Sequence, residues 1–198
     1  MRWMALAALA ALVLAAPCAA DEVHDALAQA RTAYDAGEYK DASTHVQTAL
    51  VGVNKRLTEQ LIERMPAPPT GWQAEDPEGI DTASMGLGFF AGLVVSRTYT
   101  TPDGSTIDFT IAANSPMLAT LRMFIGNPML LQMDDSGMKK VSVCGYDAIE
   151  EMEDGAAIQV LGGNSTLISI EGDSVDDADA VRQLASATDC QGIVAIVE

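Results

Sequence analysis

The residues with the most reactive side chains in this chain are three cysteines and two histidines. Cys144 and Cys190 are candidates for a disulfide, because paired thiols in an oxidising compartment commonly bond. Such a bond would close a loop of about 47 residues and stabilise the fold by about 4 kcal/mol in the chain-entropy model. The alternative is two separate buried thiols. Neither cysteine belongs to a Cys-x-x-Cys motif, so the sequence does not indicate a thioredoxin-type redox site.

Catalytic and metal-binding chemistry has few residues to draw on. A hydrolase needs a nucleophile with a base, but the only histidines, His24 and His45, fall in a helical region, and no Gly-x-Ser-x-Gly motif occurs. No His-x-x-x-His or Cys-x-x-Cys spacing indicates zinc. The acidic residues of segment 173–179 fit the first turn of a helix better than a calcium loop. We therefore predict a protein that is not an enzyme and that has no metal site and no cofactor.

A methionine-rich stretch over residues 116–133 is unusually apolar, with Arg122 as its only charge before Asp134. Three interpretations stay open for it. The stretch is buried core, or a hydrophobic surface for a lipid, peptide or protein, or a copper(I) site built from thioethers. Methionine adapts to irregular surfaces, and the residues that would form the hydrophobic surface are Met117, Leu121, Phe124, Met129 and Met133.

The N-terminus has the form of a secretory signal peptide. Arg2 supplies a positive charge, residues 4–16 form an apolar run, and Ala20 ends a stretch of small residues before an acidic start. The run is too short for a permanent membrane span, which needs about 20 residues, and no second stretch is long enough. We expect cleavage near Ala20 and a periplasmic or secreted protein. A lipoprotein acylated on Cys18 is the alternative.

The chain is strongly acidic, with a formal net charge of −17. A charge of this sign disfavours nucleic acid and anionic membrane surfaces as partners. It favours solubility and leaves cationic partners open, although a solvated acidic surface explains the composition equally simply.

An αα-hairpin is predicted over residues 21–65. Apolar residues recur at spacings of three and four on both sides of Gly37, which breaks the first helix. The apolar positions are Val23, Ala26, Leu27, Ala30, Ala33 and Tyr34, then Tyr39, Ala42, Val46, Ala49, Leu50, Val53, Leu57 and Leu61. One helical pair cannot bury such a face alone, so we expect it to pack on the rest of the chain, on another subunit or on a partner.

A proline-rich linker over residues 66–72 leads into a predicted α+β domain over 73–198. Strands are expected at 93–100 and 106–112, around a turn at 102–104, and again at 139–146, 156–161 and 166–171. Residues 146–152 extend the third of these across a bend. Ser115-Pro116 begins one helix, and Ser174 caps another over 175–187. The tail 192–197 is expected to be strand-like.

This order predicts an α+β fold, with an antiparallel sheet and packed helices preceded by the αα-hairpin. Two stretches also resemble known families. Residues 23–53 resemble a single tetratricopeptide-like unit in the spacing of their small residues, with an ordinary helical hairpin as the alternative. The residues that carry this resemblance are Ala30, Gly37, Tyr39, Ala42, Ala49 and Leu50.

Residues 68–190 resemble the Mog1/PsbP-like fold, which includes the DcrB-type envelope proteins. The resemblance is carried by the Pro-Pro-Thr-Gly-Trp opening at 68–72, the Pro-Asp-Gly turn at 102–104 and the Ser-Pro helix start at 115–116. It implies a small accessory or binding module without settled catalytic residues.

These observations predict an exported, non-enzymatic binding or accessory protein of the bacterial cell envelope, acting through contacts with an envelope protein partner. The alternative is a carrier of a hydrophobic small molecule or lipid, with the methionine-rich segment 116–133 as one wall of its pocket.

Overall fold

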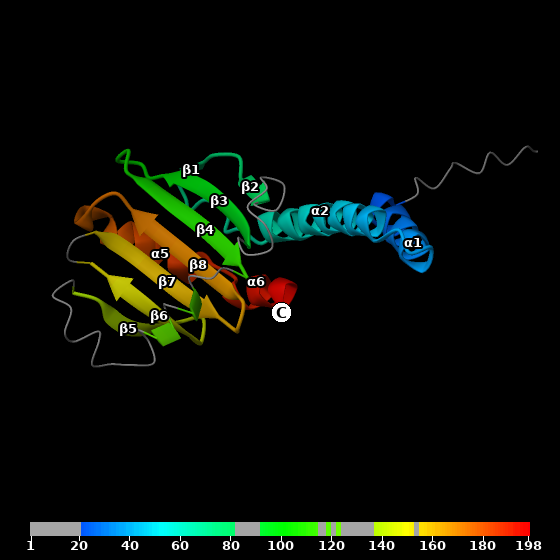
Figure 1. Cartoon of the computed structure of the whole chain (residues 1–198). Helices are drawn as coiled ribbons and strands as arrows, with labels where there is room; N and C mark the ends of the chain where they lie inside the picture. Colours follow the sequence, from blue (N-terminus) through cyan, green and yellow to red (C-terminus); the bar gives the residue numbers. More distant parts are fainter. Residues whose placement is uncertain (1–20, 82–91, 115–117, 120–121, 124–136, 153–154) are drawn as a thin grey trace, which may run out of the picture. The chain divides into compact units, whose positions relative to one another are not determined.

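The computed structural model of the chain describes residues 21–81, 92–114, 118–119, 122–123, 137–152 and 155–198 (Figure 1). The predicted methionine-rich helix falls almost entirely outside these ranges. The chain divides into two compact units, residues 1–50 and 51–198. The division falls inside helix α2 (Tyr39–Glu63), and not at the proline-rich segment where the sequence suggested a boundary.

The first unit is a helical hairpin, as predicted. Helix α1 (Glu22–Asp35) is capped by Asp21, whose carboxylate accepts a hydrogen bond of 3.2 Å from the Val23 amide. Gly37 ends the turn before α2 with a φ of +79°, a value that glycine adopts without strain. The helices meet along small side chains, which let two backbones approach closely. The buried residues of this seam are Ala26, Ala30, Ala33, Ala42 and Ala49.

The second unit is built on an eight-stranded antiparallel sheet, and the predicted α+β class is confirmed. Its strands are β1 (Gln73–Ala74), β2 (Glu78–Asp81), β3 (Leu93–Thr100), β4 (Thr106–Ala113), β5 (Lys139–Val143), β6 (Tyr146–Glu151), β7 (Ala156–Gly162) and β8 (Thr166–Gly172). The order across the sheet is β1-β3-β4-β8-β7-β6-β5, and β2 also pairs with β3. Strands β3 and β4 form the predicted hairpin around residues 101–105.

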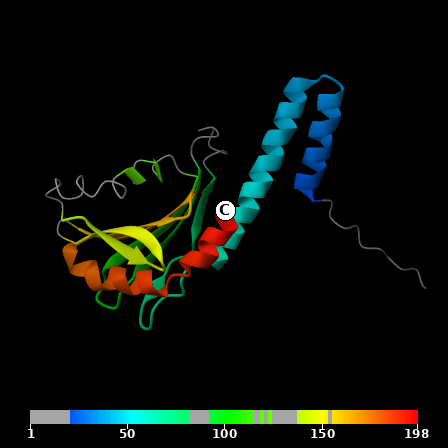
Figure 2. The same cartoon turned by 90° about the horizontal axis from the view of Figure 1, so that it is seen from below.

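Helices α5 (Ala178–Ala187) and α6 (Cys190–Val197) lie on one face of this sheet (Figure 2). Alternation along the strands directs large apolar side chains to that face, where they form the main core. Its fully buried members include Phe109, Ile111 and Ile168 from the strands and Leu184 and Ile193 from the helices. The opposite face has a smaller cluster of Ala112, Leu118, Ile149, Leu161 and Leu167.

The predicted strand-like tail at 192–197 is wrong, because these residues belong to helix α6. The Asp189 carboxylate accepts a hydrogen bond of 2.9 Å from the Gly192 amide and so caps the helix. Ile193 and Val194 are buried in the structure. Tertiary packing and the cap therefore outweigh the strand preference of a β-branched segment.

The predicted cap at Ser174 is also wrong. A 3-10 helix, η2 (Val175–Asp177), precedes α5, and Asp177 is the N-cap of α5 without a side-chain cap bond. The roles are reversed, because the Asp177 carboxylate accepts hydrogen bonds from the amide and hydroxyl of Ser174, at 2.9 and 3.3 Å. The 4 % exposure of Asp177 makes this pairing necessary, since a buried carboxylate needs donors.

Two further strand assignments need correction. Residues 139–152 form the β5–β6 hairpin and not one bent strand. Cys144 and Gly145 make its turn with φ values of +54° and +85°, the signs of a two-residue type I′ turn. Residues 73–81, where the sequence predicted no strand, contribute the short edge strands β1 and β2.

The C-terminal end of α2 belongs to the main core. Leu61 is fully buried and Met65 nearly so. The buried Tyr99 hydroxyl on β3 donates a hydrogen bond of 2.6 Å to the Pro66 carbonyl, just beyond the helix. The segment predicted as a stiff linker is therefore held against the sheet at its first residue.

Tyr99→Phe is expected to lower the free energy of unfolding by about 1 kcal/mol, because the Pro66 carbonyl loses its donor. Burial raises the pKa of Tyr99 above its usual value, with Arg97 opposing the shift. A raised folded-state pKa gives stability that is complete below about pH 10 and is lost as the pH rises further. Urea unfolding between pH 7 and 11 should show this loss in the wild type and a smaller one in Tyr99→Phe. Tyr146→Phe, at a half-buried position, is the matched control, and equal alkaline losses in all three proteins would contradict the assignment.

Candidate functional site

Within the first unit, the helical hairpin exposes four large apolar side chains that the alanine seam leaves uncovered; Val51 and Val53 are also exposed on α2, beyond that unit. Leu27 is 51 % exposed and Tyr34 65 % exposed on α1, while Tyr39 is 66 % and Val46 46 % exposed on α2. The sequence pattern grouped these residues with the alanines on a single face. The alanines are the residues that the contact between the helices buries, so the predicted face is wider than two helices can bury.

The four side chains lie on one side of the hairpin. Seven residues are close to two helical turns, so Leu27 shares a face of α1 with Tyr34, and Val46 shares a face of α2 with Tyr39. The rings of Tyr34 and Tyr39 meet edge to face with centroids 5.5 Å apart, which joins the two stripes at the turn. We call Leu27, Tyr34, Tyr39 and Val46 the hairpin face.

The hairpin face carries no carboxylate although the chain has a net charge of −17. Residues three and four positions away are neighbours on a helix surface. Within α1 and α2 these neighbours are Val23, His24, Ala30, Arg31, Ala42, Ser43, Ala49 and Leu50. Arg31 is the one charged neighbour, and it lies 4.0 Å from Asp35 in an exposed pair of the kind that contributes little to stability.

The opposite side of the hairpin is polar. Two residues along a helix turn through about 200°, so Gln29, Thr32 and Asp41 point away from Leu27, Tyr34 and Tyr39, respectively. These three line a shallow pocket of about 400 Å³, together with Glu38 and His45. The hairpin therefore has one polar, acidic side and one apolar side, and this contrast allows matched variants to be made on the two sides.

The chemistry of the hairpin face suits a protein contact. Interface cores are depleted in charge and enriched in aromatic side chains, and their tyrosines supply area at low entropic cost. Two packed helices joined by a tight turn also present these side chains in a preorganised arrangement. The sequence contained a signal for this site. Large apolar residues recur one heptad apart beside alanines that are sufficient for the contact between the two helices, and such an excess of apolar residues indicates a second contact.

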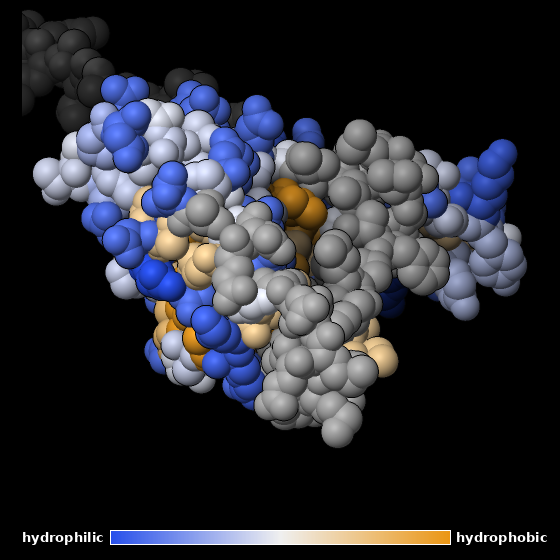
Figure 3. Space-filling view, turned by 90° about the vertical axis from the view of Figure 1, so that its left-hand side faces the viewer, coloured by the Kyte–Doolittle hydropathy of each residue, from blue (hydrophilic) through white to orange (hydrophobic). Residues whose placement is uncertain are grey.

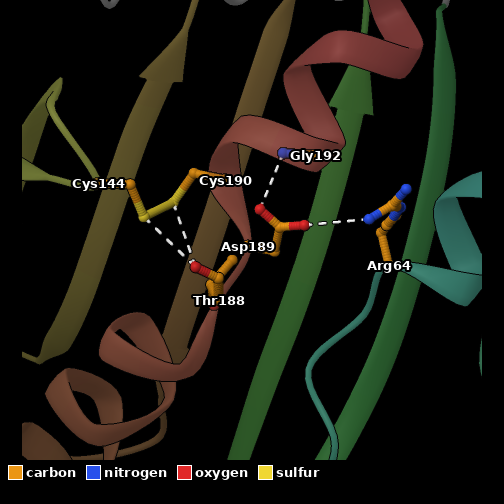
Figure 4. Close-up of polar contacts among 6 residues, drawn as sticks. All are labelled: Arg64, Cys144, Thr188, Asp189, Cys190 and Gly192. Atoms are coloured by element: carbon orange, nitrogen blue, oxygen red, sulfur yellow. Dashed lines mark hydrogen bonds and ion pairs between the residues drawn. A yellow bond between two sulfur atoms is a disulfide. The ribbon is translucent and has the colours of Figure 1, made fainter.

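The predicted cysteine pair is bonded in the structure, with the sulfur atoms of Cys144 and Cys190 2.06 Å apart (Figure 4). The bond ties the β5–β6 turn to the first residue of α6. Both sulfurs also contact the Thr188 carbonyl oxygen, at 3.4 and 3.9 Å. These are contacts and not hydrogen bonds, because a disulfide sulfur carries no hydrogen. In the same region the Arg64 guanidinium lies 3.2 Å from the Asp189 carboxylate. The C-terminal end of α2, the N-terminal end of α6 and the β5–β6 turn are therefore joined there.

The predicted hydrophobic-surface residues Met117, Leu121, Phe124, Met129 and Met133 lie outside the described residues. Two described neighbours bear on the segment in different ways. Leu118 is buried in the smaller cluster of the sheet, whereas Met123 is 69 % exposed. On the side of the molecule shown in Figure 3, hydrophilic residues cover much of the described surface.

Among the described residues, no group of three or more histidine, cysteine, aspartate or glutamate side chains could hold a metal ion. His24 lies on α1 and His45 on α2, whereas the two bonded cysteines lie in the β5–β6 turn and in α6. No helix in the described ranges combines the length and the apolarity that a membrane crossing requires.

Comparison with known proteins adds no relative: no family model, curated protein or solved structure matches this chain. The resemblances of residues 23–53 and 68–190 therefore stay predictions.

Proposed function

We propose that this protein is an exported, non-enzymatic accessory protein of the bacterial cell envelope that acts by binding another envelope protein. The observation that carries the proposal is the hairpin face, an exposed apolar surface without carboxylates on an otherwise acidic chain. Contiguous exposed apolar surface of this kind is characteristic of interaction sites.

Two further features support the cellular part of the proposal. The leading twenty residues have the form of a secretory signal peptide. The bond between Cys144 and Cys190 fits an oxidising compartment, since cytosolic thiols are kept reduced. Fractionation of expressing cells should find a periplasmic protein whose N-terminal residue is Asp21. A chain recovered from the cytosol with Met1 retained would contradict the proposal.

Affinity capture from envelope extract tests the binding function. The bait is the whole chain, in the wild-type form, in the variant Leu27→Glu/Val46→Glu, and in the matched control Gln29→Glu/Thr44→Glu. Each variant adds two carboxylates to the hairpin at exposed positions, so only the side differs. We expect at least one envelope protein to be retained by the wild type and the control, and reduced at least tenfold with the face variant, because an interface core excludes unpaired charge.

Equal capture by all three baits would contradict the role of the hairpin face, provided that circular dichroism shows the same helix content for each. Absence of any envelope protein from the wild-type capture would contradict the proposed function itself.

A further inference from the structure

We infer that the occupant of the hairpin face is a second copy of this chain, so that two hairpins pack face to face as a four-helix bundle. The inference rests on the proposed function in one respect, since both assign binding to Leu27, Tyr34, Tyr39 and Val46. It goes further by naming the occupant of the face in the free protein, so that an envelope protein binding the same four residues would displace the second copy.

Charge is the first argument for a second copy. Two chains of net charge −17 repel one another, so close self-association requires a surface on which no carboxylates are brought together. The hairpin face meets that requirement, because its in-helix neighbours include no acidic residue. A basic partner would find no carboxylate to pair with among these neighbours. The complement of a neutral apolar face is another such face, and a second copy supplies it.

Area is the second argument. A tyrosine side chain presents about 150–250 Å². At their exposed fractions the four side chains together present of the order of 450 Å² per copy. Two copies would then bury about 900 Å² from these side chains alone, and the flanking turns of the helices would bring the total above the ~1,000 Å² of a specific interface. Weak and transient complexes bury areas near this lower limit.

The spacing of the residues is the third argument. Leu27 and Tyr34 are one heptad apart, and so are Tyr39 and Val46. Apolar residues at heptad spacing form the seam by which a helix packs on a partner helix at a small crossing angle. Each hairpin therefore has one apolar seam on each of its two antiparallel helices, side by side, which is the arrangement that four-helix bundles use in their cores. A two-fold axis would present the same patch from both copies.

Sedimentation equilibrium of the purified whole chain between about 1 and 500 μM tests the inference. We expect a monomer–dimer equilibrium that tightens as salt is raised from about 50 to 500 mM, because salt screens the repulsion between two acidic chains. Leu27→Glu/Val46→Glu should weaken the dimer by about 100-fold, because the added carboxylates would be buried without partners. The control Gln29→Glu/Thr44→Glu should leave the dissociation constant of the dimer within about threefold of the wild-type value.

A mixing experiment shows whether the two copies meet through the same face. The variant Leu27→Lys/Val46→Lys should also be monomeric alone. Mixed in equal amounts with Leu27→Glu/Val46→Glu, it should form a heterodimer that native mass spectrometry identifies by its mass. Failure of the mixture to associate would overturn the inference, as would a wild type that stays monomeric throughout the concentration range, or a dimer indifferent to the face variants.

The results separate this inference from the proposed function. A monomeric wild type that still retains an envelope protein through the hairpin face refutes the second copy and leaves the function in place. A dimer that forms through the face and captures no envelope protein supports the second copy and contradicts the proposed function.

Discussion

Replacing Cys190 with alanine should lower the free energy of unfolding by about 4 kcal/mol, because the bond to Cys144 closes a long loop in the unfolded chain. Single domains are commonly stable by only about 5–15 kcal/mol, so this loss is a large fraction of the total. The bond also holds α6 to the β5–β6 turn, and its loss removes a restraint on a helix with only eight residues. Guanidinium unfolding of wild type and variant under oxidising conditions gives the difference directly.

Reduction provides the internal control for this prediction. A reducing agent should lower the stability of the wild type to near that of Cys190→Ala and leave the variant unchanged. Position 144 adds a second comparison, because Cys144 has a φ of +54° that a side chain disfavours by about 1–2 kcal/mol. Cys144→Gly should therefore cost about 1 kcal/mol less than Cys144→Ala. A loss under 1 kcal/mol on removing the bond would show that it does not constrain the unfolded chain.

The second large effect is expected at Leu61, near the C-terminal end of α2. Leu61 is fully buried in the main core of the second unit. Leu61→Ala should lower the free energy of unfolding by about 3 kcal/mol, because it removes buried methyl groups and leaves a cavity. Urea denaturation followed by near-ultraviolet circular dichroism is the appropriate measurement, since it reports tertiary packing.

Val53→Ala is the matched control for Leu61→Ala, because Val53 lies on the same helix and is 40 % exposed. Its cost should be about 0.5 kcal/mol or less. Both variants should be compared at one low protein concentration, because association would add to the apparent stability. Similar small costs at the two positions would mean that the end of α2 is not part of the core.

The sequence predicted the αα-hairpin and the strands that follow Gly92 because those segments have clear periodicity. In β4, for example, Ile107, Phe109 and Ile111 alternate with polar or small residues, and all three are fully buried. Patterns of this kind are set locally by which face a residue must present. The Cys144–Cys190 pair also followed from counting, because the predicted signal peptide contains Cys18 and only two cysteines follow it.

The features that sequence reasoning missed depend on contacts made after folding. Helix α6 contains Ile193, Val194, Ile196 and Val197, and this composition favours a strand until the cap from Asp189 and the surface of the sheet are present. The hairpin face was missed for a similar reason. Periodicity shows which residues share a side of a helix, but it does not show that an alanine seam leaves the larger side chains uncovered.

The order of the strands also has a consequence for how the chain folds. Strands β3 and β4 pair locally, and so do β5, β6, β7 and β8 in turn, whereas the β4–β8 pairing must bridge residues 114–165. Pairing at that distance carries the largest loop-closure entropy and should limit the folding rate. Both cysteines lie in the later segment, so oxidation can precede this step. Until β8 pairs with it, one edge of β4 stays open, and we expect aggregation of the newly made chain to begin there.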